Sequence, residues 1–314
     1  MTVPHPFDRR AHPPGARFFD WRAPDGWLYR RMDWPQPEGT APRGTLLFAG
    51  GRGDFIEKYL EAMAHWHAQG WHIASFDWRG QGASRGDSIG GHLDSLDLLV
   101  DDFAALAADV RGQGEGRGPF VTVAHSMGGH VLLRSLAERR VEADAAVLVA
   151  PMLMINSAPV PPWAAWWSAS ALSWMGWSRA PAWRESDEAE RPRSRQKFLT
   201  SCPDRFEDEL FWWRAEPRYK IGAPSWGWID AAFRSCATLT DSKLKALNMP
   251  ILFVATEADR LVAASAIRRA ADLIPGARLK MFADAAHEIL RESDKVRLEA
   301  LAAIDTFLSE TASR

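Results

Sequence analysis

The segment Val121–His130 (VTVAHSMGGH) constrains the fold most, because it predicts a buried strand that turns abruptly into a helix. Ser126 stands at the break. In so tight a turn, the residues two before and two after the serine must be small, since strand and helix would otherwise collide. Ala124 and Gly128 occupy these positions. The pattern is typical of a nucleophile elbow, although Ala124 replaces the usual glycine. A strand end with a chance serine is the alternative.

The chain is long enough for one large core, or for a core domain that carries an inserted subdomain. Of its 314 residues, 46% are hydrophobic and 25% are charged, as in ordinary globular proteins. A formal net charge of −2 argues against nucleic-acid binding. The two cysteines, Cys202 and Cys236, cannot form a disulfide framework, and no Cys/His spacing resembles a metal site. The sequence therefore implies no metal, no cofactor and no protein partner.

The N-terminal region does not resemble a targeting signal. The first twenty residues contain four prolines and several charges, without an apolar stretch that could act as a signal sequence. No proline-free apolar run reaches the length of about 18 residues that a membrane span requires. We therefore expect a cytoplasmic protein, with peripheral attachment to the inner membrane surface as an open alternative.

Short apolar strands alternate with amphipathic helices along most of the chain. A turn-forming tetrapeptide at residues 23–26 predicts an antiparallel hairpin near the N-terminus. The alternation that follows predicts an α/β fold with a mostly parallel central sheet, covered by helices on both faces. The expected strands are 44–50, 71–76, the strand before Ser126, 145–150, 250–255 and 278–282. The expected helices have apolar stripes at 56–66, 96–110, 131–133 and 264–274, and from Asp294 onward.

This alternation is interrupted between Pro151 and Pro250. A gap of roughly a hundred residues is too long for a loop and predicts a subdomain. We therefore expect a core made of residues 1–151 and 249–314, with an inserted helical cap at residues 152–248. The cap contains ten of the chain's 16 tryptophans.

Two polar residues follow later strands at the sheet edge where open parallel sheets place their sites. Asp259 comes after strand 250–255, and His287 comes after strand 278–282. A serine hydroxyl needs a base to accept its proton, and the base needs an acid to orient it. Ser126, His287 and Asp259 therefore form a candidate catalytic triad, with Glu257 as an alternative acid. Their order differs from that of chymotrypsin-like and subtilisin-like proteases.

A serine nucleophile that attacks a carbonyl also needs two backbone N–H groups for the oxyanion. We expect one from Met127, the residue after the serine. We expect the other from Arg52, in the glycine-rich loop that follows strand 44–50. The alternative is that these glycines merely form a turn. His125 and His130 adjoin the elbow and are expected to pack around it.

Several segments together resemble the α/β-hydrolase superfamily in its lysophospholipase and monoacylglycerol lipase branch. These are DWRGQGAS at 77–84, AHSMGG at 124–129, ADR at 258–260, HEIL at 287–290 and, in the cap, RYKIGAPSWGW at 218–228. The resemblance implies an α/β-hydrolase fold, Ser126, Asp259 and His287 as the triad, and Met127 with Arg52 as the oxyanion hole. This sequence departs from the family pattern at Ala124, and also at residues 49–51, where many relatives have His-Gly.

Five tryptophans lie at near-helical spacing in a stretch of the cap, residues 156–178, that has no charged residue. They can pack the cap onto the core, line an acyl-chain tunnel or rest at a membrane interface, and these alternatives are compatible. An apolar lid over a serine favours a fatty-acyl ester as substrate. The five are Trp163, Trp166, Trp167, Trp174 and Trp177.

The predicted function is that of a serine carboxylester hydrolase without a cofactor. It would cleave the acyl chain of a small-molecule lipid ester, a lysophospholipid or monoacylglycerol, through an acyl-enzyme intermediate. Another carboxylesterase or an acyltransferase with the same triad is the nearest alternative. A ligand-binding or sensor protein without turnover is the alternative from another class.

Overall fold

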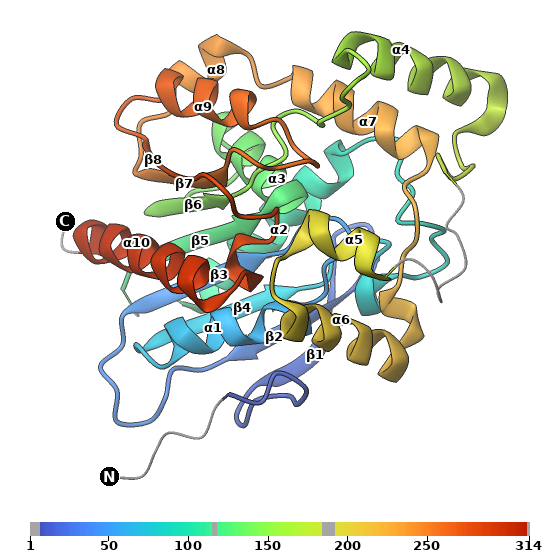
Figure 1. Ribbon diagram of the computed structural model, residues 1–314. Coiled ribbons are helices and arrows are strands. Elements are labelled where there is room, and N and C mark those ends of the chain that lie inside the picture. The colour runs from blue at the N-terminus through green and yellow to red at the C-terminus, as the bar shows by residue number, and fades with distance from the viewer. Residues whose placement is uncertain (1–6, 115–117, 184–191, 313–314) are drawn as a thin grey trace.

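One eight-stranded sheet forms the centre of the computed structural model, which describes residues 7–114, 118–183 and 192–312 (Figure 1). The strand order is β1-β2-β4-β3-β5-β6-β7-β8. The predicted hairpin is confirmed as β1 (Arg17–Arg22) and β2 (Leu28–Trp34), and β2 pairs antiparallel with β4. All other pairs are parallel, as predicted. The parallel strands are β3 (Gly44–Ala49), β4 (Trp71–Phe76), β5 (Phe120–His125), β6 (Ala145–Val149), β7 (Ile251–Thr256) and β8 (Arg278–Phe282).

Helices cover both faces of this sheet, so the inner strands are buried throughout and consist mainly of apolar residues. Leu46 and Phe48 of β3 pack into the cluster that contains α1 (Leu60–His67) and α10 (Asp294–Ala312). Leu47 packs on the opposite face, with α2 (Asp97–Gln113), α3 (Ser126–Ala137) and α9 (Ala264–Leu273). The predicted α/β-hydrolase architecture is therefore confirmed. Short helical turns η1 (Ile56–Tyr59), η2 (Gly82–Ser84) and η5 (Ile289–Arg291) lie between these elements.

The described part of the segment between β6 and β7 is helical and adds no strand to the sheet. In Figure 1, α4 lies along α7, whereas α5 and α6 lie apart from this pair, near α1. We call residues 162–177 the Trp-rich arm and residues 192–215 the docked arm. The elements are α4 (Pro162–Leu172), η3 (Ser173–Trp177), α5 (Pro192–Leu199), α6 (Pro203–Ala215), η4 (Pro217–Tyr219), α7 (Trp226–Ala237) and α8 (Asp241–Lys245). No helix in the described ranges is long and apolar enough to cross a membrane.

Candidate active site

Ser126 directly follows β5 and is the first residue of α3, with a φ of 51°, in the left-handed region that non-glycine residues rarely adopt. The crowding expected at this turn is present. A Cβ atom on Gly128 would lie 2.3 Å from the carbonyl oxygen of Gly50. A Cβ atom on Gly51 would lie 2.8 Å from the Cβ of Ser126. Ala124, at the end of β5, is fully buried. The strand, the turn and the loop after β3 therefore meet at the serine with space only for small side chains.

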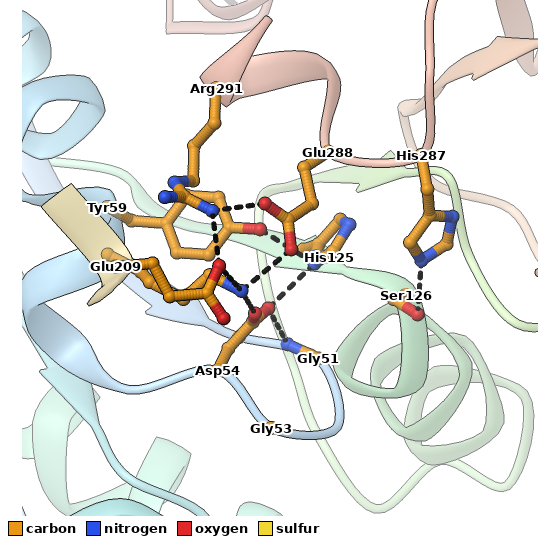
Figure 2. Close-up of polar contacts among 12 residues, drawn as sticks. Gly51, Gly53, Asp54, Tyr59, His125, Ser126, Glu209, His287, Glu288 and Arg291 are labelled. Carbon is orange, nitrogen blue, oxygen red and sulfur yellow. Dashed lines mark hydrogen bonds and ion pairs between the residues drawn. The ribbon is translucent and has the colours of Figure 1, made fainter. Parts of the chain in front are cut away.

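His287 lies between the serine and Asp259. Its Nε2 atom is 2.8 Å from Ser126 Oγ, and its Nδ1 atom is 2.7 Å from Asp259 Oδ2 (Figure 2 shows the Ser126 contact). The backbone N–H groups of Leu261 and Val262 donate to the other oxygen of Asp259, which orients the carboxylate. The alternative acid, Glu257, instead pairs with Arg268. The structure thus brings together the three residues of the candidate triad from three different strand ends.

The charges of this pair support each other. Burial alone would lower the pKa of His287, but the negative charge and hydrogen bond of Asp259 outweigh it and raise that pKa above its ordinary value. For Asp259, burial alone would raise the pKa, but the histidine charge and hydrogen bond lower it overall. The ionised form of each partner is therefore favoured by the other, as a triad requires when its histidine accepts a proton.

The loop after β3, residues 50–53, is held by the segment 77–84. Trp78 Nε1 donates to the carbonyl oxygen of Gly50 at 2.6 Å. The side-chain oxygen of Gln81 accepts the N–H of Gly53 at 2.6 Å. These contacts give segment 77–84 a structural role beside the serine.

Arg52, in the same loop, extends its side chain towards the insertion. Its Nη2 atom donates to the carbonyl oxygens of Gly90 and Gly222, at 2.8 and 3.0 Å, and its guanidinium group lies over the ring of Trp228. Met127 is the second residue of α3. The first four N–H groups of a helix have no acceptor within the helix, so helix geometry makes this amide a suitable donor. The assignment of Arg52 and Met127 to an oxyanion hole stays a prediction.

A buried ionic network lies beside the serine, and the sequence interpretation missed it (Figure 2). Lys58 Nζ is 2.7 Å from Asp54 Oδ1 and 2.7 Å from Glu288 Oε1. Asp54 Oδ2 accepts the N–H of Gly51 at 2.6 Å. Two signals were available: Asp54 and Lys58 are four residues apart, and Glu288 directly follows His287.

His125 belongs to the same network. It was expected only to pack around the elbow, but its Nδ1 atom is 2.7 Å from Asp54 Oδ2 and 2.9 Å from Tyr59 Oη. Its ring centroid is 4.8 Å from that of His287. His130 does pack beneath the elbow, where its Nε2 contacts Ser235 Oγ of α7. No group of three or more His, Cys, Asp and Glu side chains in the described ranges is arranged to bind a metal ion.

The five tryptophans of the Trp-rich arm divide into two groups. Trp166 is half-buried, and its Nε1 donates to Asp230 of α7 at 3.0 Å, so it packs the arm onto the rest of the insertion. The other four side chains are between 59% and 89% exposed. Packing onto the core therefore does not account for them. These four are Trp163, Trp167, Trp174 and Trp177.

Comparison with known proteins identifies the family of this chain. The family model described as "serine aminopeptidase, S33" matches residues 40–294. The chain is 26% identical over 276 residues to a probable lysophospholipase of Haemophilus influenzae, covering 87% of this chain and 86% of that protein. It is 24% identical over 258 residues to a monoacylglycerol lipase of Mycolicibacterium smegmatis, covering 82% and 85%.

Solved structures show the same fold. A soluble variant of the monoglyceride lipase of Saccharomyces cerevisiae superimposes with a TM-score of 0.71 at 18% identity, over 98% of this chain and all of that one. A thermostable carboxyl esterase of Bacillus coagulans superimposes with a TM-score of 0.75 at 16% identity, over 96% of this chain. With the matched family and the two relatives, these findings lead to one conclusion. The chain belongs to the α/β-hydrolase superfamily, in its lysophospholipase and monoacylglycerol lipase branch, and is a carboxylic ester hydrolase.

Proposed function

We propose that this protein hydrolyses the fatty-acyl ester of a lysophospholipid or a monoacylglycerol, with Ser126, His287 and Asp259 as its catalytic triad. One observation carries the proposal: His287 contacts both Ser126 Oγ and Asp259 Oδ2, at 2.8 and 2.7 Å, while the serine adopts the left-handed conformation of a nucleophile elbow.

In the first half of the reaction, Ser126 Oγ attacks the ester carbonyl carbon and its proton passes to His287 Nε2. The carbonyl oxygen becomes an oxyanion, which accepts hydrogen bonds from the N–H groups of Met127 and Arg52. The C–O bond to the alcohol then breaks, and His287 gives its proton to the departing glycerol oxygen. In the second half, His287 deprotonates water, which attacks the acyl-enzyme and releases the fatty acid with regeneration of Ser126.

Two observations support a single-chain lipid ester as substrate. The names of the relatives specify lysophospholipase and monoacylglycerol lipase activity, and both substrate types carry one acyl chain on a glycerol unit. The Trp-rich arm adds an apolar element, with no charged residue between 156 and 178. A long acyl chain needs such a surface because each buried methylene contributes about 0.8 kcal/mol.

We further propose that the Trp-rich arm contacts a lipid surface. Lysophospholipids and monoacylglycerols collect in membranes and micelles, and tryptophan is favoured where an apolar phase meets water. Four exposed tryptophans on one short arm form the kind of apolar surface that marks an interaction site. In this proposal the protein binds the membrane peripherally and receives its substrate there.

The test is a panel of purified esters: a lysophosphatidylcholine, a monoacylglycerol, an aryl acetate and a peptide ester, with Ser126→Ala as the blank. Release of free fatty acid from the first two, and its loss in the blank, would support the proposal. Transfer of the acyl group to added glycerol would identify an acyltransferase instead. Binding of the lipids without turnover by the wild type would contradict the proposal.

A further inference from the structure

Glu209 is a carboxylate of the docked arm that is completely buried. It extends from α6 to Lys58 of the core, where Glu209 Oε2 is 3.6 Å from Lys58 Nζ, and to Arg291, at 3.3 Å (Figure 2 shows Glu209 beside Arg291). Its other oxygen accepts a hydrogen bond from Arg195 of α5, at 2.9 Å. A buried charge carries a large desolvation penalty unless it is well paired. A lid that only covers the site from the solvent side would not need to bury a carboxylate in this way.

The network that Glu209 enters has balanced charges. Apart from His125, three cations, Lys58, Arg291 and Arg195, face three carboxylates, Asp54, Glu288 and Glu209. Burial opposes ionisation of Glu288, but the cations Lys58 and Arg291 hold its pKa down at about 2. All three carboxylates are at most 4% exposed, so the loss of one leaves a cation without its full set of partners.

The network ends at residues 50–53, the loop proposed to hold the oxyanion, which we call the oxyanion loop. Lys58 holds one oxygen of Asp54, and the other oxygen of Asp54 accepts the Gly51 N–H. Gly51 directly precedes Arg52 and lies against Ser126. Asp54, whose Oδ2 also contacts His125, therefore contributes with Trp78 and Gln81 to the position of the loop relative to the serine.

The docked arm also holds the backbone of the loop that carries His287, which we call the histidine loop. The N–H groups of His287 and Glu288 donate to the carbonyl oxygens of Phe198 and Leu199, at the end of α5. Thr200 Oγ1 donates to the carbonyl oxygen of Arg291 at 2.7 Å. Both the histidine and the oxyanion loop are thus connected to residues of the insertion.

We infer that Glu209 is a positioning residue for catalysis. It acts through Lys58 and Asp54 on the oxyanion loop, and the docked arm is a fixed part of the catalytic geometry. Without the charge of Glu209, Lys58 and Arg291 would redistribute among the two remaining core carboxylates. Asp54 would then no longer hold Gly51 in place. This inference rests on the proposed ester hydrolysis and adds a residue to it.

The experiment compares Glu209→Gln with two matched controls. Glu207→Gln changes the same residue type at an exposed position of α6. Asp33→Asn removes a buried carboxylate of β2 that pairs with Arg31. All variants are assayed with a soluble butyrate ester at a temperature where circular dichroism shows them folded. We expect Glu209→Gln to lower kcat about 10- to 100-fold with KM within about twofold, because oxyanion stabilisation acts only in the transition state.

Glu207→Gln should change neither kcat nor melting temperature, and Asp33→Asn should lower only the melting temperature. Wild-type kcat in folded Glu209→Gln would overturn the inference. If that variant does not fold, Glu209→Asp, which keeps the charge but shortens its reach, takes its place. A severalfold fall in kcat would then be expected, and an unchanged kcat would overturn the inference.

A double variant separates positioning from charge balance. Lys58→Met with Glu209→Gln removes one cation and one carboxylate, so the remaining network is again balanced. A purely structural role for Glu209 predicts that kcat returns to the wild-type level, which would overturn the inference. A positioning role predicts that kcat stays low, because Asp54 has lost Lys58. Butyrate hydrolysis by the wild type, absent in Ser126→Ala, must come first. Failure of the wild type to hydrolyse this ester, a lysophosphatidylcholine or a monoacylglycerol would refute the proposed function itself.

Discussion

The two arms of the insertion differ in what they bury. The docked arm buries charge: Glu209 is fully enclosed among core cations, and the carbonyl oxygens at the end of α5 accept the backbone of the histidine loop. The Trp-rich arm exposes apolar surface, with four of its tryptophans more than half exposed. Ionic and hydrogen-bonded contacts are directional, whereas apolar contacts depend mainly on area. One segment between two strands thus contains one part suited to hold a site still and another suited to adapt to lipid.

The proposed role of the docked arm requires that Ser126, His287 and Asp259 form the catalytic triad. Ser126→Ala should leave a folded protein and lower kcat by about 10⁴- to 10⁶-fold, because the nucleophile is lost. Steady-state hydrolysis of a butyrate ester and circular dichroism measure both properties. Turnover near the wild-type level in this variant would contradict the triad, and with it the positioning role of the docked arm.

Asp259→Asn should lower kcat by about 10⁴-fold, because His287 loses the carboxylate that orients it. Glu257→Gln should have little effect, since Glu257 pairs with Arg268 at the surface. The reverse result would mean that Glu257 is the acid.

The pH dependence offers a second measurement on the same pair. His287 must be neutral to accept a proton, and Asp259 raises its pKa. In the wild type, kcat/KM should therefore rise with pH through a pKa above the ordinary value of about 6.5. Without the carboxylate, the residual activity of Asp259→Asn should rise at lower pH. If the acid limb of the pH profile of kcat/KM lies at the same pH in Asp259→Asn as in the wild type, this would argue against direct coupling of the two residues.

The buried ionic network beside the serine should make the protein sensitive to acid. The pKa of Asp54 is held well below its usual range, where the charges of Lys58 and His125 outweigh burial, and that of Glu288 is about 2. Because both values are lower in the folded state, their stabilisation is present above the unfolded values of about 4 and is lost as pH falls towards 2. For Glu288 the loss is on the order of 3 kcal/mol.

Chemical denaturation at a series of pH values measures this loss. Glu288→Gln should be less stable at neutral pH and should lose less of its remaining stability on acidification, because it lacks the carboxylate whose pKa is lowered. The free energy of unfolding of Trp174→Ala, in the charge-free arm, should depend on pH as that of the wild type does, displaced by a constant amount. Identical acid sensitivity in wild type and Glu288→Gln would mean that the ionic network does not hold Glu288 ionised.

The smallest effects are expected in the Trp-rich arm. Trp167→Ala and Trp174→Ala should weaken binding to phospholipid vesicles severalfold, because each removes an exposed aromatic side chain. Hydrolysis of a soluble butyrate ester should be unchanged. Trp166→Ala should instead lower the melting temperature, since Trp166 is bonded to Asp230. Vesicle sedimentation and thermal unfolding distinguish these outcomes, and equal vesicle binding by all variants would refute membrane contact.

Alanine variants at all five tryptophan positions test whether these side chains line the acyl path. In that case laurate hydrolysis should fall more than butyrate hydrolysis, because each methylene adds about 0.8 kcal/mol of binding. The ratio of the two kcat/KM values, measured below the aggregation limit of laurate esters, is the observable. A constant ratio across the five tryptophan positions would leave packing and membrane contact as their roles.

The sequence by itself determined the features that depend on local pattern. The alternation of apolar strands and amphipathic helices predicted the α/β sheet. The small residues around Ser126 predicted the elbow, and polar residues directly after two strands predicted the partners His287 and Asp259. The structure brings these three residues together because parallel strands bring their carboxyl ends to one edge, so position along a strand almost settles position in space.

Only the tertiary structure decided what the insertion does at the site. Lys58 and Glu288 are 230 positions apart, and no local pattern relates either of them to Glu209. The Trp-rich stretch was conspicuous in the sequence, yet burial alone separates Trp166 from its four exposed neighbours. A buried ionic network requires complementary charges from distant segments to meet in a region without water. That meeting follows from how the helices pack on the sheet, so the network became visible only in the folded chain.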